Sequence, residues 1–161
     1  MTTSALLNLF EHNLWANLRL FDRCATLDQQ QLATTDPGAF GSIQATLAHI
    51  VSAERSYVWR LQSQPATWQR IDTQALTVTQ LRPLIAESGQ QLLDLAAIAD
   101  TLAPVERKDE SGEVWVIPAP FILTQAIHHA NEHRTNITTI LATLGIIDSD
   151  LSGWDFWLAQ R

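Results

Sequence analysis

Three histidines are the residues of this chain whose types and spacing point to chemistry. His129 and His133 lie four residues apart, so on a helix their imidazole rings project from one face about one turn apart. The same face carries the apolar residues Ile122 and Ile137, which predicts that both rings point into the protein interior. His49 lies far upstream in a strip of small residues, where a ligand or a neighbouring helix has room to approach.

We expect these three side chains to meet at one divalent metal ion. Three neutral imidazoles that leave positions open for water or substrate are a typical ligand set of catalytic zinc, nickel or iron. An ion in such a site lowers the pKa of a bound water or thiol. The alternative is a structural role, since core histidines also hydrogen-bond to backbone groups or to Ser and Asn. His12 and His128 lie on other helix faces, and we expect neither to coordinate the ion.

Other common catalytic arrangements do not occur in the sequence. Glu11, Glu54, Glu87 and Glu132 are not followed by a histidine three positions later, which excludes the Glu-x-x-His pairs of di-iron bundles. Glu132 directly precedes His133, so the segment is not the His-Glu-x-x-His motif of zinc proteases. We find no glycine-rich phosphate loop and no nucleophile elbow. The candidate chemistry therefore rests on the histidines.

Four long segments with apolar residues at spacings of three and four must position these side chains. The segments are residues 4–27, 42–62, 77–99 and 118–144. Between the third and the fourth, residues 105–118 combine charged residues, a Ser-Gly turn and a β-prone run, which predicts a loop with hairpin character. Four amphipathic helices of about 22 residues favour an all-α four-helix bundle. We expect one domain that covers residues 1–161.

Composition excludes several classes of partner. The 17 acidic and 10 basic residues give a net charge of -7, which argues against a nucleic-acid partner. The single cysteine, Cys24, excludes an intrachain disulfide and fits a reducing compartment. No signal peptide pattern opens the chain, and no window reaches 18 consecutive apolar residues. We therefore expect a cytoplasmic protein that has no membrane partner.

Some of the remaining large and charged side chains predict particular contacts. Trp154, Phe156 and Trp157 follow the last long helix, and so many aromatic residues predict a tail that packs on the bundle or on a second subunit. This supply of apolar surface predicts a homodimer. Glu54 lies on the apolar stripe of its helix and Arg134 follows His133, which is compatible with a buried or interfacial salt bridge between a Glu and an Arg whose pairing the sequence leaves open.

Tryptophans elsewhere in the chain have two interpretations. Trp15, Trp59 and Trp115 are large enough to line the mouth of a pocket. The simpler interpretation, which we prefer for each, is that they anchor the core or an interface.

Four groups of residues occur in an order and at a spacing that resemble a known family. They are residues 14–17 (Leu-Trp-Ala-Asn), residues 46–50 (Thr-Leu-Ala-His-Ile) with Glu54, Arg55 and Trp59 following, the turn at Gly112, and residues 129–134 (His-Ala-Asn-Glu-His-Arg) with Ile137, Leu144 and Gly145 following. Together they span about residues 6–157, and this combination resembles the DinB-like superfamily of damage-inducible and thiol-transferase-related four-helix bundles.

The resemblance implies properties that helical periodicity alone does not determine. It implies an up-down-down-up bundle with long crossover connections and frequent homodimers. It also implies that His49, His129 and His133 are metal ligands, with nickel or zinc as the ion. Characterised members use low-molecular-weight thiols such as bacillithiol or mycothiol in transferase or isomerase reactions. Nothing in the chain identifies a thiol-binding pocket, so the substrate is not implied.

Two functions from different classes follow from these observations. The first is a divalent-metal-dependent enzyme, such as a thiol S-transferase or a related hydrolase or isomerase, in which the ion activates a small-molecule thiol. The alternative is a dimeric binding or stress-response module in which a metal ion ties two helices together without catalysis. The enzyme requires an open coordination position beside a cavity that solvent can reach, whereas the binding module does not.

Overall fold

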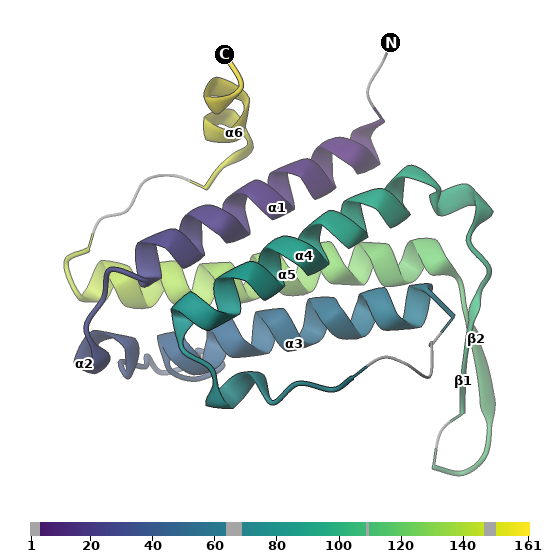
Figure 1. Ribbon diagram of the computed structural model, residues 1–161, viewed down its shortest axis with the longest axis horizontal. Helices are drawn as coiled ribbons and strands as arrows, with labels where there is room; N and C mark the ends of the chain where they lie inside the picture. Colours follow the sequence, from purple (N-terminus) through teal and green to yellow (C-terminus); the bar gives the residue numbers. More distant parts are fainter. Residues whose placement is uncertain (1–3, 64–68, 109, 147–150) are drawn as a thin grey trace.

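Four long helices form an up-down-down-up bundle in the computed structural model, which describes residues 4–63, 69–108, 110–146 and 151–161. The helices are α1 (Ala5–Cys24), α3 (Ile43–Leu61), α4 (Val78–Ala97) and α5 (Ala119–Thr143). In Figure 1, α1 and α5 run in one direction, while α3 and α4 run in the other. Residues 69–77 run back along α3 to the start of α4, as parallel neighbouring helices require. This arrangement confirms the expected all-α fold and its topology.

The ends of the long helices follow the capping signals in the sequence. Ser42 precedes α3 and accepts a hydrogen bond from the backbone N–H of Ala45, and Thr77 precedes α4 with a reciprocal capping box. α5 begins after Pro118, and Gly145 follows its end with a φ of 71°, a conformation that glycine adopts without strain. All four helices lie within three residues of the predicted segment boundaries.

Shorter elements connect and extend the bundle. They are α2 (Gln29–Leu32), α6 (Gly153–Ala159), the 3-10 turns η1 (Thr73–Ala75) and η2 (Ala99–Thr101), and the strands β1 (Val105–Lys108) and β2 (Val114–Ile117). The strands pair as an antiparallel hairpin that joins α4 to α5, with Val105 opposite Ile117. The hairpin expected between the third and fourth long helices is therefore present.

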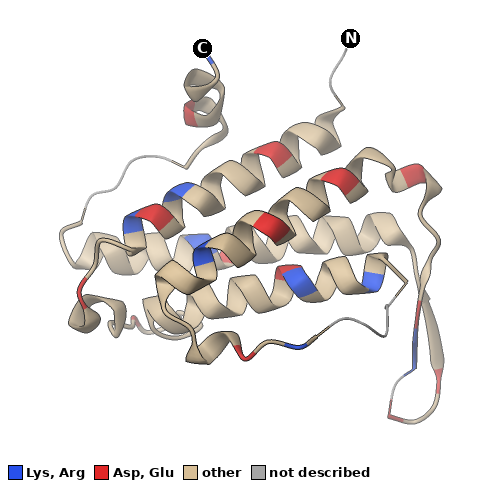
Figure 2. Cartoon of the chain, in the orientation of Figure 1, with Lys and Arg blue, Asp and Glu red and all other residues tan. Residues whose placement is uncertain are grey.

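Charged residues are distributed unevenly over these elements. Figure 2 shows acidic and basic residues on both α1 and α4, basic residues in the half of α3 nearer the hairpin, and basic residues in β1. Within the described residues, no helix is both long enough and apolar enough to cross a membrane.

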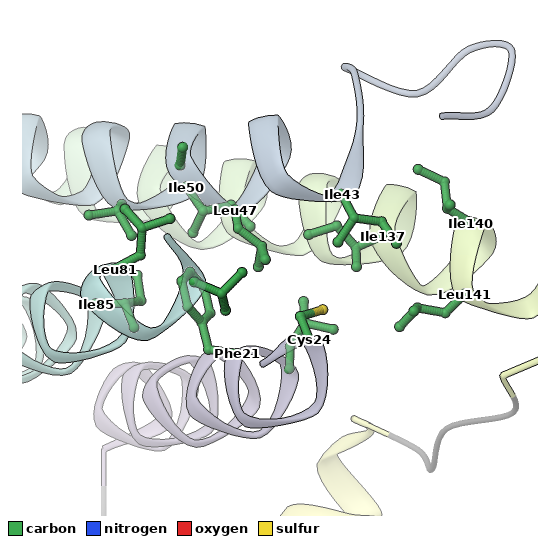
Figure 3. Close-up of a cluster of buried hydrophobic side chains, with 14 residues drawn as sticks. Phe21, Cys24, Ile43, Leu47, Ile50, Leu81, Ile85, Ile137, Ile140 and Leu141 are labelled. Carbon is green, nitrogen blue, oxygen red and sulfur yellow. The ribbon is translucent and has the colours of Figure 1, made fainter. Parts of the chain in front are cut away.

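Two apolar clusters fill the interior of the bundle. Figure 3 shows the first, around Phe21, Leu47, Ile85 and Ile137, which come from all four long helices. The second lies toward the hairpin and includes Phe10, Val58, Leu92, Leu123 and Ala126. Burial of these side chains supplies the main driving force for helix packing.

A buried polar layer lies between the two apolar clusters. Glu54 of α3 accepts hydrogen bonds from the side-chain amides of Asn13 and Asn17 of α1, at 2.9 and 2.7 Å, and from the Ser88 hydroxyl of α4. The carbonyl oxygens of the same two asparagines accept hydrogen bonds from the Arg134 guanidinium of α5. Glu54 and Arg134 thus interact through two asparagines, so the polar layer connects all four long helices.

Burial has opposite effects on the two charged groups of this layer. Loss of water raises the pKa of the Glu54 carboxyl above its ordinary value, against the hydrogen bonds from Asn13 and the charge of Arg134. Loss of water also lowers the pKa of Arg134 to about 10, although the charge of Glu54 acts in the other direction.

The C-terminal tail packs on the bundle through part of its aromatic surface. The Phe156 ring lies 5.6 Å from that of Trp15 and 5.7 Å from that of His12, measured between centroids. Trp154, Trp157 and Leu158 of α6 remain exposed, with 77% of the Trp154 surface accessible. The expectation that the tail covers the bundle therefore holds for Phe156.

Candidate metal centre

The neighbouring helices α3 and α5 bring the three predicted histidines together. The Nε2 atoms of His49 and His129 lie 2.9 Å apart, although the two residues are 80 positions apart in the sequence. The ring of His133 lies 4.4 Å from that of His129 and 4.7 Å from that of His49, measured between centroids. One helical turn separates His129 and His133, as the sequence spacing predicts.

Distances among the donor atoms are compatible with a shared ion. One nitrogen from each ring belongs to a group whose atoms all lie within 4.8 Å of one another. Two nitrogens that bind the same ion at about 2.1 Å lie at most about 4.2 Å apart. A small rotation of the side chains is therefore enough for the three rings to bind one ion.

Burial and mutual repulsion favour the neutral form of His49 and His129, which is the form that binds metal. Desolvation lowers the pKa of His129 to about 4, and the charges that His133 and His49 would carry act in the same direction. Desolvation and His133 likewise lower the pKa of His49. The Nδ1 atom of His133 is buried and has no hydrogen-bond partner in the described part of the chain. The donor set thus fits a divalent metal ion.

Two aromatic side chains that the sequence did not point to border the histidines. Phe40, in the loop before α3, stacks on His49 with ring centroids 4.0 Å apart, and its edge meets His133 at 5.1 Å. Its backbone N–H donates to the Asn136 side chain of α5, which holds the loop in place. Tyr57 meets His129 edge-on at 6.0 Å. Tyr57 follows His49 by about two turns of the same helix, a spacing from which it could have been identified.

A cavity borders the cluster at His49. It has a volume of about 370 Å³ and lies between α3 and the connection that leads to α4. His49 and Ser52 form one wall, and residues 70–74 form the other. Of the three histidines, His49 is the one that lines this cavity.

The other residues considered as site candidates lie elsewhere. The Nε2 atom of His12 lies 2.7 Å from the backbone oxygen of Leu151, and the His12 ring packs on Trp15. His128 and Glu132 are exposed on α5. Neither His12 nor His128 belongs to the histidine cluster.

The three tryptophans considered as pocket residues have different environments. Trp59 lines a cavity next to the hairpin, whereas Trp15 packs against Phe156. Trp115 is 57% exposed on β2. The pocket interpretation therefore holds for Trp59, and the packing interpretation holds for Trp15.

Comparison with known proteins identifies the family. The model of the DinB family matches residues 1–154, which is nearly the whole chain. The chain belongs to the DinB family. A DinB relative, Protein DinB of Bacillus subtilis, is 22% identical over 145 residues, which cover 85% of this chain and 84% of the relative.

The family match confirms the resemblance of the tryptophan and histidine motifs to the DinB-like superfamily. For this DinB chain, the structure adds that the three histidines meet on α3 and α5 and that they could hold a metal ion.

Proposed function

We propose that this protein is a divalent-metal-dependent enzyme whose metal ligands are His49, His129 and His133. One observation carries the proposal. One donor nitrogen from each of the three imidazoles lies within 4.8 Å of the other two, and His49 also lines a cavity. A purely structural metal site is usually closed by four protein ligands, whereas a catalytic site keeps a position open for substrate. Three ligands beside a cavity therefore favour catalysis over the alternative of a metal-stabilised binding module.

The residues around the cluster have separate tasks in this proposal. His49 and His129, whose pKa values are lowered, present neutral nitrogens at physiological pH. Phe40 covers the rings of His49 and His133 on one side, which limits the access of water. An ion such as nickel or zinc would supply Lewis acidity, which lowers the pKa of a thiol or water that binds to it.

The reaction class we propose is the transfer of a small-molecule thiol to an electrophile. In this reaction the thiol loses its proton, the sulfur forms a bond to an electrophilic carbon, and the displaced electron pair leaves with the departing group. A thiolate is the reactive form of a thiol, so a site that favours deprotonation accelerates the reaction. No protein nucleophile is needed, which agrees with a cluster made of imidazoles only.

An activity assay with matched variants tests the proposal. Protein loaded with nickel or zinc is mixed with cysteine and 1-chloro-2,4-dinitrobenzene, and the conjugation rate is compared with the uncatalysed rate. We expect catalysis in the wild type and in His128→Ala, and loss of at least about 100-fold in His129→Ala. If the wild type binds metal but accelerates neither this reaction nor those of a panel of other thiols, the non-catalytic binding module is the better account.

We further propose that the protein is a homodimer. What supports this is the exposed apolar surface of α6, where Trp154, Trp157 and Leu158 lie on the outside of the bundle. A symmetric pair of such surfaces would remove them from water.

A further inference from the structure

A second cavity lies next to the metal centre, between the end of α3, the hairpin and the start of α5. Its volume is about 470 Å³, within the size range of sites for small organic molecules. Aromatic side chains and basic side chains line the same cavity. We propose that this cavity binds a small organic anion that has an apolar or aromatic body.

The side chains around this cavity are mainly positive, whereas the chain as a whole is negatively charged. Arg60, Arg107 and Lys108 line it, and Glu106 is the one acidic residue among the lining residues that the structure describes. Three of the chain's ten basic residues, with its only lysine among them, therefore gather at one place on a protein of net charge -7. Positive side chains from two separate elements repel one another unless an anion lies between them.

The three cations are available to a ligand. Among the residues that the structure describes, the ion pairs join Arg55 to Glu87 and Arg82 to Asp22, so neither includes Arg60, Arg107 or Lys108. A carboxylate between these groups would gain charge-assisted hydrogen bonds, which are about twice as strong as neutral ones.

The remaining wall suits the apolar part of the ligand. Tyr57 and Trp59 of α3 and Phe121 of α5 line the cavity together with the aliphatic residue Ile117 of the hairpin. Phe121 is 63% exposed, although it is a large apolar residue, so a ligand that packs on its ring would remove apolar surface from water. An anion without an apolar body would leave these aromatic and aliphatic side chains in contact with water.

Tyr57 connects this cavity with the metal centre. Its ring lines the cavity and also meets the ring of His129 edge-on, with the ring centroids 6.0 Å apart. A molecule in the cavity is thus separated from His129 by one side chain. If this ligand is a substrate of the metal centre, that role rests on the proposed function. Its binding to the cavity does not require a metal.

Calorimetric titration of metal-free protein tests the inference. The probe is 3-phenylpropionate, and its uncharged analogue 3-phenylpropionamide is the matched control. We expect the acid to bind at least about tenfold more tightly than the amide, because only the carboxylate accepts charge-assisted hydrogen bonds from the basic side chains. Arg60→Gln should weaken the binding of the acid about tenfold, whereas Arg82→Gln, which removes a distant cation, should leave it unchanged.

The possible outcomes separate this inference from the proposed function. Equal affinities for acid and amide, no binding of the acid at millimolar concentration, or equal effects of Arg60→Gln and Arg82→Gln would each overturn the inference. Thermal melting of both variants shows whether they are folded, and the double variant Arg107→Gln/Lys108→Gln provides a second test on exposed side chains. Binding of the acid that survives in His129→Ala supports the anion site even if the metal-dependent reaction is not found.

Discussion

Phe40 lies flat on the imidazole of His49, with ring centroids 4.0 Å apart and an angle of 20° between the planes. This contact fixes the ring orientation of one proposed metal ligand from outside the helix that carries it. Residues that orient a metal ligand commonly change metal affinity by about 10- to 100-fold when they are replaced. Phe40 therefore supports the metal site by orienting a ligand, although its own side chain cannot bind metal.

We expect Phe40→Ala to weaken metal binding by about tenfold, because His49 would lose the ring that restricts its rotation. Phe121→Ala is the matched control, since it also removes an exposed phenylalanine but one that lines the other cavity. Competition with a chromophoric chelator measures both affinities. Similar affinities in the two variants would show that the stacked ring does not support the site.

The polar layer of the bundle predicts a large effect on stability. Glu54→Ala removes the acceptor of the two asparagines and leaves the Arg134 guanidinium buried without an anion. Removing one partner of a buried charged network costs about 3–5 kcal/mol of the free energy of unfolding. Glu87→Ala, which breaks the surface ion pair with Arg55, should cost about 1 kcal/mol or less. Urea unfolding of both variants checks this difference, and equal losses would contradict it.

Helical periodicity explains why much of the fold was predictable. The long helices carry continuous apolar stripes and begin at recognisable caps such as Ser42 and Thr77, so their extents follow from local sequence. The spacing of His129 and His133 likewise places both rings on one face. α2 is only four residues long, too short for a periodic pattern to appear.

Contacts between distant segments could not be predicted in the same way. Phe40 reaches the site because its loop folds back over α3 and α5, and no local pattern encodes that path. Asn13 and Asn17 have a helical spacing, but only the packed bundle shows that they lie between Glu54 and Arg134. Tertiary packing decided both arrangements.

The pH dependence of metal binding should reflect the lowered pKa values. With an ordinary histidine pKa of about 6.5, the affinity would fall as the pH drops from about 7 to 5. Burial lowers the pKa of His49 and lowers that of His129 to about 4, so protons compete with the metal for these two ligands only at lower pH. We therefore expect part of the loss of metal affinity to occur below pH 6 and not all of it between pH 7 and 5. Metal titrations at pH 7, 6, 5 and 4 measure it.

Stability of the metal-free protein should fall over the same range. The unfolded chain takes up protons on its histidines near pH 6.5, whereas His129 in the folded chain does so near pH 4. The unfolded state therefore binds more protons between these values, and the free energy of unfolding decreases as the pH falls through this window. Thermal unfolding of the wild type and of His129→Ala checks the effect, which should be smaller in the variant. An identical pH dependence would argue against it.

Sedimentation velocity tests the proposed homodimer. We expect a dimer at micromolar concentration in the wild type and a monomer in Trp154→Ser/Trp157→Ser, because that variant removes the exposed aromatic surface of α6. Trp115→Ser removes an exposed tryptophan from the hairpin instead, and it should remain dimeric. A monomeric wild type would refute the proposal.

Metal analysis of protein purified without a histidine tag tests the central claim most directly. The wild type and His128→Ala should each bind about one divalent ion per chain, and His129→Ala should bind none, because His129 lies in the cluster with His49 and His133 while His128 is exposed. Mass spectrometry of the bound metal gives both its identity and its amount. Equal metal content in the two variants, or a wild type that binds no divalent ion, would contradict the assignment of this site.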